Sequence, residues 1–347
     1  MSERVRAFIG CLWGCAVGDA IGLPYEGLSV RRVRRFARLP LRHRFVLGRG
    51  MVSDDTDHTV FVAQALLRSG GDPARFQAAL AWRLRLWLLC LPAGIGLATL
   101  RSILRLWLGL RPSGVFSAGN GPAMRSAILG VYFAHDAAAR RAHVEASTRL
   151  THTDPLALSG ALAVAEIAAR LASGEWMERP AAAELAAMLQ GLPSQTEWQE
   201  AVQAIQQCCE AADPLAAAIN HFGSRQGVTG YVLRSVPFAI VAWYHHFGDY
   251  RATIETITQA GGDVDTVASI AGALAGIQTG PEGIPEAWRT GLVDWPHSLG
   301  YLQRLAAALA DPAAPVTTTF SPFLFVRGVV FTLLVLAHGL RRLLPPY

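Results

Sequence analysis

The sequence contains no lysine, so each of its 31 basic residues is an arginine, and charged residues make up only 16% of the chain. Globular proteins usually carry about a quarter. Apolar residues account for 52%, which excludes intrinsic disorder and a collagen-like chain and is enough for a large buried core. The net charge of +5 is too small to indicate a nucleic-acid partner by itself, and we expect none.

Cysteine is scarce as well, with five residues that form no C-x-x-C pair and no zinc-binding spacing. This excludes a disulfide scaffold, and an odd number of cysteines is typical of a reducing compartment. The first residues lead directly into an apolar helix, without a long hydrophobic leader or an A-x-A cleavage site. We therefore expect a cytoplasmic protein.

Stretches that alternate β-branched and polar residues are nearly absent. Instead, Ala and Leu dominate, and apolar residues recur at intervals of three and four, as in an amphipathic helix. The pattern predicts an all-α domain over 1–315 and a hydrophobic helical tail over 316–347. Segments rich in Gly and Pro predict the loops between helices: 22–29, 38–56, 110–122, 173–181, 191–196 and 279–287.

The predicted tail is apolar on every side between Gly328 and Ala337, which indicates burial in protein or in lipid. Ten helical residues cover about 15 Å of a hydrocarbon layer roughly 30 Å thick, and a longer span would place Arg327 inside it. We therefore expect no complete membrane crossing. Two interpretations remain open for 320–347: a helix packed on its own domain or on a partner, and an anchor at the inner membrane surface.

A second unusual segment, 31–44, holds seven arginines and His43. The simplest interpretation is a solvated, arginine-rich surface helix or loop. A stripe that binds phosphate or nucleic acid is the alternative.

Two short acidic clusters stand out: S-D-D-T at 53–56 and G-G-D-V-D-T at 261–266. Each combines carboxylates with a hydroxyl at the expected start of an Ala/Val-rich helix. Asp and Ser are common N-caps, but these clusters together with Asp57 hold more carboxylates than two helix starts need. Carboxylates this close repel one another unless a cation lies between them. Hard divalent cations prefer oxygen ligands of this kind, so the clusters predict a shared metal site.

The segment before these clusters repeats glycine every four residues, at Gly10, Gly14 and Gly18, which predicts close packing of a helix. Asp19 in that helix needs a buried partner or a role. Glu26 follows a Gly/Pro break and is expected on a loop that can project into a site, although by itself it would be an ordinary surface carboxylate.

Two further motifs carry polar groups before helices. G-N-G-P-A-M-R at 119–125 predicts a turn whose backbone amides suit a phosphate, with Arg125 suited to pair with negative charge. T-H-T-D at 151–154 includes His152, whose position is more typical of a capping or core histidine than of a catalytic one.

Taken in order, these motifs resemble the ADP-ribosylglycohydrolase family, which includes the hydrolases that remove ADP-ribose from dinitrogenase reductase, arginine and serine. The resemblance covers about 1–300 and rests on five blocks: G-C-A-V-G-D-A-I-G-x-P-x-E (14–26), S-D-D-T (53–56), G-N-G-P-A-M-R (119–125), T-H-T-D-P (151–155) and G-G-D-V-D-T (261–266). It implies a compact, orthogonal multi-helix all-α domain with two Mg²⁺ or Mn²⁺ ions in a cleft. The implied activity is metal-dependent hydrolysis of the bond between ADP-ribose and an acceptor, either an ADP-ribosylated protein or a small molecule.

The resemblance also implies roles for individual residues. The metal ligands would be Ser53, Asp54, Asp55, Asp263, Asp265 and Thr266. The residues binding ADP-ribose would be Gly119, Asn120, Gly121, Met124, Arg125, His152, Gly261 and Gly262. Glu26 or Asp55 would take the proton of the attacking water, and the sequence leaves that choice open.

One departure from the family concerns Ile95-Gly96. The dinitrogenase-reductase branch has an Asp before this pair, whereas here Pro92-Ala93-Gly94 precede it, which puts arginine-linked substrates in question. Two alternatives to a hydrolase remain: a catalytically inactive relative that binds ADP-ribose, and a two-metal nucleotide phosphoesterase that would release AMP.

Overall fold

A computed structural model describes residues 1–311 and 313–342, and the predicted tail residues 343–347 lie outside this range. The chain is 67% helical, and the only β-structure in the described residues consists of isolated bridges, so the predicted all-α fold is confirmed. The elements are α1 (Glu3–Gly22), η1 (Leu23–Tyr25), α2 (Val30–Phe36), α3 (Asp54–Ser69), α4 (Pro73–Leu88), α5 (Leu97–Trp107), α6 (Gly121–Met124), α7 (Ala127–Tyr132), α8 (Ala137–Arg149), α9 (Pro155–Ala172), α10 (Ala182–Gln190), α11 (Thr196–Glu210), α12 (Pro214–Phe222), α13 (Val232–His245), α14 (Tyr250–Ala260), α15 (Val264–Gly283), α16 (Glu286–Gly291), α17 (Leu299–Ala310) and α18 (Phe323–Arg341).

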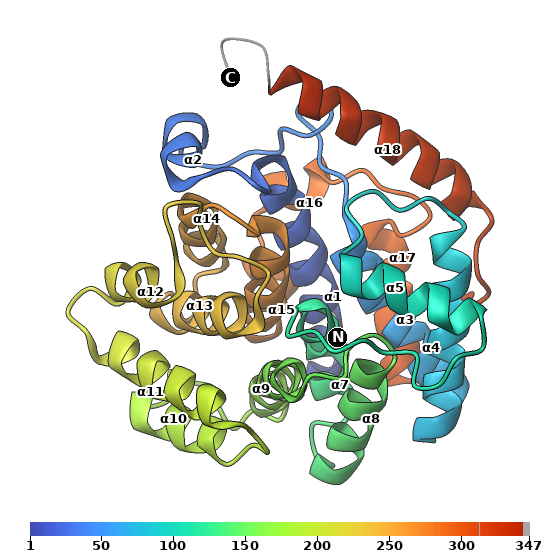
Figure 1. The fold of residues 1–347 in the computed structure, drawn as a ribbon, viewed down its shortest axis with the longest axis horizontal. Helices are drawn as coiled ribbons and strands as arrows, with labels where there is room; N and C mark the ends of the chain where they lie inside the picture. Colours follow the sequence, from blue (N-terminus) through green and yellow to red (C-terminus); the bar gives the residue numbers. More distant parts are fainter. Residues whose placement is uncertain (312, 343–347) are drawn as a thin grey trace.

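Helices α1 and α15 form the buried centre around which the others pack (Figure 1). Their backbones are so close that a Cβ atom on Gly10 would lie 2.0 Å from the carbonyl oxygen of Gly276, and one on Gly14 would lie 2.1 Å from that of Gly272. Larger residues therefore cannot replace these glycines without moving the helices apart. Because the contacts run in opposite order along the two helices, the C-terminal end of α1 lies beside the N-terminal end of α15.

Several of the predicted loops overlap helices, and two of these overlaps concern the central helix α15 and the start of α3. α15 continues to Gly283 across a kink at Gly280, whose φ of 71° bends the chain before helical hydrogen bonding resumes. Most of the predicted loop 279–287 is therefore helical, and that prediction was wrong. α3 begins at Asp54, inside the predicted loop 38–56, because Ser53 caps it by accepting a hydrogen bond from the backbone N–H of Asp55.

The arginine-rich segment 31–44 forms α2 and the loop that follows it. All seven arginines are exposed, whereas His43 is buried and its Nε2 lies 2.7 Å from the carbonyl oxygen of Trp288. Both interpretations place the arginines at the surface, so their exposure does not choose between them.

Three helices among the described residues are long and apolar enough to cross a membrane by length and composition. Two of these segments, Glu3–Tyr25 and α9, are mostly buried inside the protein, at 94% and 72%. The third, α18, is only 22% buried and lies along the surface of the domain (Figure 1). Its inner side contacts the protein through Leu324, Arg327, Gly328 and Phe331.

Candidate active site

Three helix ends meet around the buried side chain of Asp19, near the C-terminal end of α1. Its carboxylate accepts hydrogen bonds from the backbone N–H of Ser53, at 2.9 and 3.0 Å, and from the hydroxyl of Thr56, at 2.5 Å. Asp19 therefore holds the start of α3 beside α1. Since α15 begins at the same end of α1, the two acidic clusters of the sequence come together there.

The first turns of α3 and α15 are linked through Asp55. Its Oδ2 accepts one hydrogen bond from the hydroxyl of Ser53, at 3.1 Å, and one from the hydroxyl of Thr266, at 3.2 Å. Asp54 lies beside Asp55 at the N-terminus of α3, and Asp265 lies in the first turn of α15. Both helix dipoles therefore direct their positive ends at the cluster.

The carboxylates of this cluster are held in an environment that disfavours their negative charge. Burial, together with the charges of neighbouring carboxylates, raises the pKa of Asp54, Asp55 and Asp265 well above the usual value. Burial also raises the pKa of Asp19 to about 7, although its hydrogen bonds oppose the shift. At the rim of the cluster, partial burial and the charge of Asp263 raise the pKa of Glu26. A bound cation would relieve this repulsion.

The chemistry of the cluster fits divalent cations. Asp55 Oδ1 and Asp265 Oδ1 are buried and make no hydrogen bond, which leaves two carboxylate oxygens available as ligands. All donors are oxygens, as Mg²⁺ and Mn²⁺ prefer. Among the described residues, no three His, Cys, Asp or Glu side chains are already gathered at metal-binding distance. Ligation would therefore draw these side chains together.

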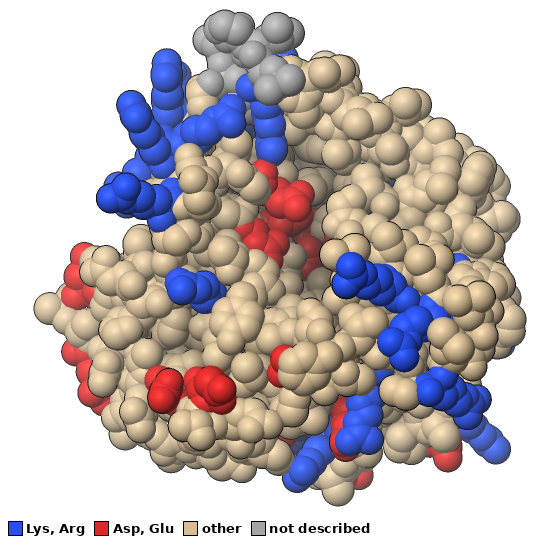
Figure 2. Space-filling model, in the orientation of Figure 1, with Lys and Arg blue, Asp and Glu red and all other residues tan. Residues whose placement is uncertain are grey.

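A cavity of about 430 Å³ opens beside the cluster, and Figure 2 shows the acidic side chains at the bottom of this hollow. This volume is typical of sites for small organic ligands. Asn120 donates a hydrogen bond of 2.7 Å to Asp263 Oδ2 and so connects the cavity wall to the cluster. The predicted site residues in the wall are Glu26, Asp54, Gly119, Asn120, Gly121, Met124, His152, Asp263, Asp265 and Thr266.

His152 packs against two glycines of the cavity wall. A Cβ atom on Gly119 would lie 3.0 Å from its Nε2, and one on Gly121 would lie 3.2 Å from its Cε1, so the ring occupies the space that side chains would fill. Burial and the nearby charge of Arg125 lower the pKa of His152 to about 3. The imidazole is therefore neutral at physiological pH and is suited to hydrogen bonding rather than to donating a proton as an imidazolium.

Three residues predicted to bind the ligand are not in the cavity wall. Arg125 is fully buried behind it, where it donates hydrogen bonds to the hydroxyls of Ser147 and Thr151. Arg125 therefore does not line the cavity wall, and its role in ligand binding stays a prediction. Gly261 and Gly262 both have positive φ and pack against the backbone of Leu28 and Val228, so they shape the approach to α15 instead of the cavity surface.

Sequence reasoning missed the contribution of α18. A smaller cavity of about 130 Å³ adjoins the acidic cluster, and its wall includes Ser53 as well as Phe331, Val335, His338 and Arg342. The feature of the sequence that indicates this contribution is Arg327. An arginine within an apolar helix requires a buried acidic partner, and Arg327 Nη2 lies 2.9 Å from Asp294 Oδ2.

Comparisons with known proteins agree with this architecture. The family model described as ADP-ribosylglycohydrolase matches residues 1–316. An uncharacterized protein of Archaeoglobus fulgidus is 31% identical, over 90% of this chain and 97% of its own length. The ADP-ribosyl-[dinitrogen reductase] glycohydrolase of Rhodospirillum rubrum is 24% identical, over 81% and 88%. ADP-ribosylhydrolase ARH3 of Gallus gallus is 26% identical, over 81% and 87%.

A solved structure described as an ADP-ribosylglycohydrolase-related protein complex shares the fold, with a TM-score of 0.64 and 24% identity over 89% of this chain and 99% of that one. The family match covers all five sequence motifs and ends before α18. The chain therefore belongs to the ADP-ribosylglycohydrolase family.

Proposed function

We propose that the protein hydrolyses the glycosidic bond between C1″ of ADP-ribose and an acceptor, with two Mg²⁺ or Mn²⁺ ions held by the acidic cluster. The observation that carries this proposal is the pair of buried, unpartnered oxygens, Asp55 Oδ1 and Asp265 Oδ1, beside a ligand-sized cavity. The names of the Rhodospirillum rubrum and Gallus gallus relatives support the same chemistry.

The metal ligands would come from both helix starts: Ser53, Asp54, Asp55, Asp263, Asp265 and Thr266. When bound, divalent ions supply positive charge that orients ribose hydroxyls and lowers the pKa of water. The protein's own contribution is to fix these oxygens. Asp19 holds the start of α3, and Asn120 holds the carboxylate of Asp263 through the 2.7 Å hydrogen bond.

Glu26 is better placed than Asp55 to take the proton of the attacking water. It lies at the rim of the cluster and lines both cavities, whereas Asp55 is buried and lines neither. One oxygen of Asp55 already accepts two hydrogen bonds. The elevated pKa of Glu26 also brings its basicity closer to neutral pH, as a general base requires.

The larger cavity would hold the ADP-ribose moiety. Its walls offer backbone groups at Gly119 and Gly121 and the neutral ring of His152. Such groups can hydrogen-bond to ribose hydroxyls and phosphate oxygens without adding a competing charge next to the metals.

The test is incubation of the purified protein with ADP-ribosylated protein, ADP-ribosyl-arginine and ADP-ribosyl-serine, in Mg²⁺, in Mn²⁺ and in EDTA. Mass spectrometry of the products should show intact ADP-ribose, released only when a metal is present. Release of AMP would identify a phosphoesterase instead, and binding of ADP-ribose without any release would identify an inactive relative.

A matched control separates the site from general effects of removing a carboxylate. Asp54→Ala changes the cluster, whereas Asp213→Ala removes an exposed aspartate that caps α12 away from the site. The first substitution should abolish release and the second should leave it unchanged. Both variants should retain the helical circular-dichroism spectrum.

A further inference from the structure

The two cavities meet at the acidic cluster. Four residues line both of them: Glu26, Asp54, Gly94 and Asp265. The larger cavity continues towards Asn120 and His152, while the smaller one continues under α18. A substrate whose reacting bond lies at the shared carboxylates would therefore have one part in each cavity.

Helix α18 is firmly held where it covers the smaller cavity. Gly328 packs so closely that a Cβ atom there would lie 1.8 Å from the carbonyl oxygen of Cys90. At its end, Arg342 donates hydrogen bonds to the carbonyl oxygens of Glu26, at 2.9 Å, and of Pro24. The same helix thus forms one wall of the cavity and holds the loop that carries Glu26. It lies beyond residue 316, where the family match ends.

The smaller cavity selects by size and charge. Its volume of about 130 Å³ is close to that of the roughly 150 Å³ apolar cavity that holds one benzene ring. Leu23, Phe45, Phe331 and Val335 give it apolar walls, and the rings of Phe45 and Phe331 lie 5.5 Å apart between centroids. Among the described residues, the carboxylates in this wall are Glu26, Asp54 and Asp265, which also line the larger cavity, and Arg342 adds positive charge.

We infer that the smaller cavity is the acceptor subsite and that it accepts an uncharged, ring-sized acceptor in preference to a guanidinium. This inference rests on the hydrolase activity proposed above. In the reaction, the bond between C1″ and the acceptor breaks and the oxygen of a water forms the new bond to C1″. One proton of that water passes to the departing acceptor, so the products are ADP-ribose and the protonated acceptor.

The experiment fills the smaller cavity without touching the larger one. Val335→Trp places an indole in the acceptor subsite, and Met177→Trp places the same group at a position that is 79% exposed in the α9–α10 connection. For each variant we would measure ADP-ribose binding by calorimetry in Mn²⁺, and kcat/KM for an ADP-ribosyl-pyrimidine adduct and for ADP-ribosyl-arginine.

Val335→Trp should lower kcat/KM for the pyrimidine adduct at least tenfold while the affinity for ADP-ribose stays within twofold. Met177→Trp should change neither. Wild-type protein should favour the uncharged adduct over ADP-ribosyl-arginine at least tenfold. Unchanged turnover in Val335→Trp, or a preference for the arginine adduct, overturns the inference. Failure of the wild type to hydrolyse either adduct overturns the proposed function itself.

A second variant that fills the smaller cavity keeps the test decisive if Val335→Trp does not fold. Gly339 also lines the smaller cavity, and a Cβ atom built there has no heavy atom within 4 Å. Gly339→Leu therefore adds volume without a clash and should lower turnover in the same direction as Val335→Trp. If Val335→Trp does not fold, full activity in a folded Gly339→Leu variant rejects the subsite by itself.

The outer side of α18 carries a separate observation. It carries five exposed apolar side chains, which we call the outer face of α18: Phe325, Val326, Leu333, Leu336 and Leu340, each at least half exposed. Leu89 and Leu91, at 54% and 56% exposed, extend it, because the hydroxyl of Thr332 donates to the carbonyl oxygen of Leu91 at 3.1 Å. A patch of this kind on a protein surface marks an interaction site.

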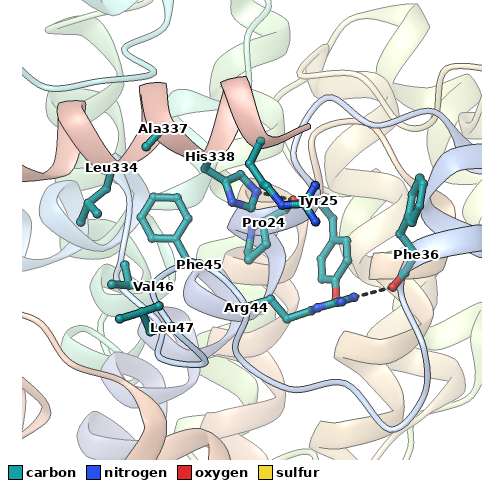
Figure 3. Close-up of a pocket in the computed structure, with 11 residues that line it drawn as sticks. Pro24, Tyr25, Phe36, Arg44, Phe45, Val46, Leu47, Leu334, Ala337 and His338 are labelled. Atoms are coloured by element: carbon teal, nitrogen blue, oxygen red, sulfur yellow. Dashed lines mark hydrogen bonds between the residues drawn. The ribbon is translucent and has the colours of Figure 1, made fainter. Parts of the chain in front are cut away.

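Positive charge borders this outer face at its C-terminal end. A terminal nitrogen of Arg32, in α2, donates to the carbonyl oxygen of Arg342 at 3.3 Å, which places the arginine-rich segment 31–44 beside that end. Figure 2 shows arginines gathered there. Figure 3 shows Arg44, Phe45 and Leu334 in the groove between α18 and the loop that follows α2. This groove has a volume of about 420 Å³, and Arg341 also lines it.

We propose that this surface binds an anionic lipid bilayer. The outer face of α18 would lie in the interfacial layer and the arginines would contact phosphate groups, which suits their planar, multiple-donor geometry. The positive charge of these arginines complements the negative charge of lipid phosphates, which favours a lipid surface over an uncharged groove of another protein. α18 would lie in the membrane plane because its buried Arg327 is tied to Asp294 inside the protein.

Flotation of the full chain with vesicles tests this surface. Wild-type protein should bind phosphatidylglycerol-containing vesicles at least tenfold more than pure phosphatidylcholine vesicles, and 0.5 M salt should reduce binding, as screening requires. Leu333→Glu combined with Leu336→Glu should abolish flotation, whereas Met177→Glu should not. Equal flotation of the double variant, or no flotation of wild type, overturns the proposal. If the wild type is a dimer and the double variant is a monomer, the outer face of α18 binds a second copy of the chain. That result also overturns the proposal of lipid binding.

Discussion

Two groups of carboxylates lie about one helical turn apart at the start of α3, and their pKa values shift in opposite directions. Asp57 accepts a hydrogen bond of 3.1 Å from the Trp87 indole, and its Oδ1 lies 2.8 Å from His297 Nδ1. Although burial opposes the shift, the charge of Arg327 and the His297 hydrogen bond lower the pKa of Asp57. Asp54 and Asp55 have mainly other carboxylates near them, and their pKa values are raised.

The comparison distinguishes an acidic group that the protein itself neutralises from the one that we propose binds metal. Asp57 is neutralised by residues of the protein, because Arg327 from α18 lies between it and Asp294. No arginine of the described residues lies at the centre of the cluster around Asp54, Asp55 and Asp265. This cluster opens to a cavity instead. Burial without compensation costs stability, so such an arrangement is typical of sites that receive a cation from solution.

The largest expected effect is on turnover. Asp265→Ala should lower hydrolysis by about 10³-fold, because it removes a proposed metal ligand and with it the electrostatic stabilisation that the metal would supply. In EDTA its free energy of unfolding should equal or exceed that of wild type, since a repelling carboxylate is gone. Steady-state kinetics and urea unfolding on the same preparation measure both. Wild-type activity in Asp265→Ala would break the site assignment.

The next largest expected effect is on the free energy of unfolding. Arg327→Met should lower the free energy of unfolding by about 3–5 kcal/mol, because Asp57 and Asp294 would remain buried without their shared cation. Denaturant unfolding measures the loss. Adding Asp294→Asn to Arg327→Met should recover part of it, since one of the uncompensated charges disappears. If the single substitution costs less than 1 kcal/mol, the contrast between the two acidic groups is wrong.

Metal addition should stabilise the protein through the cluster of Asp54, Asp55 and Asp265 and not through Asp57. At 100 times its Kd, each Mn²⁺ ion that binds should raise the free energy of unfolding by about 2.7 kcal/mol. Thermal unfolding with and without EDTA measures this gain. Asp54→Ala should lose most of this gain in stability. Arg327→Met should keep the full gain, although it is less stable than the wild type without metal. An equal gain in Asp54→Ala would show that the metal binds elsewhere.

The smallest effect is on the pH dependence of stability in EDTA. The pKa of Asp19 is about 7 in the folded protein, against about 3.9 for an unperturbed aspartate, so between these values the folded state binds more protons than the unfolded state. Stability should therefore fall as pH rises through this window, by about 1.4 kcal/mol per unit for this one group. Because the pKa of Asp57 is lowered, its contribution changes only below about pH 4.

Urea midpoints at pH 5 and pH 6 measure this slope. Asp19→Asn should flatten it, and saturating Mn²⁺ should flatten it in the wild type, because a bound cation favours the ionised carboxylates. A stability that rises with pH over this window in EDTA would contradict the raised pKa values.

Much of the site was predictable because its residues occur in short, local patterns. Glycines four residues apart predict the contact of α1 with another helix, and S-D-D-T and G-G-D-V-D-T predict oxygen ligands at helix starts. Each of these patterns needs only neighbours in the sequence. Arg125 shows the limit of such reasoning: a basic residue after a glycine-rich turn is compatible with ligand binding or with burial, and here Ser147 and Thr151 hold it inside the protein.

The sequence by itself determined that the chain is helical, that it has a large apolar core and that two acidic clusters begin two helices, since these properties depend on residue type and local spacing. Only the tertiary structure decided which carboxylates share a cation from the protein and which do not. It also placed α18 beside the cluster and distinguished its inner face from its exposed one. These outcomes depend on contacts between residues far apart in the chain, such as Arg327 with Asp57 and Arg342 with Glu26, and no local pattern records them.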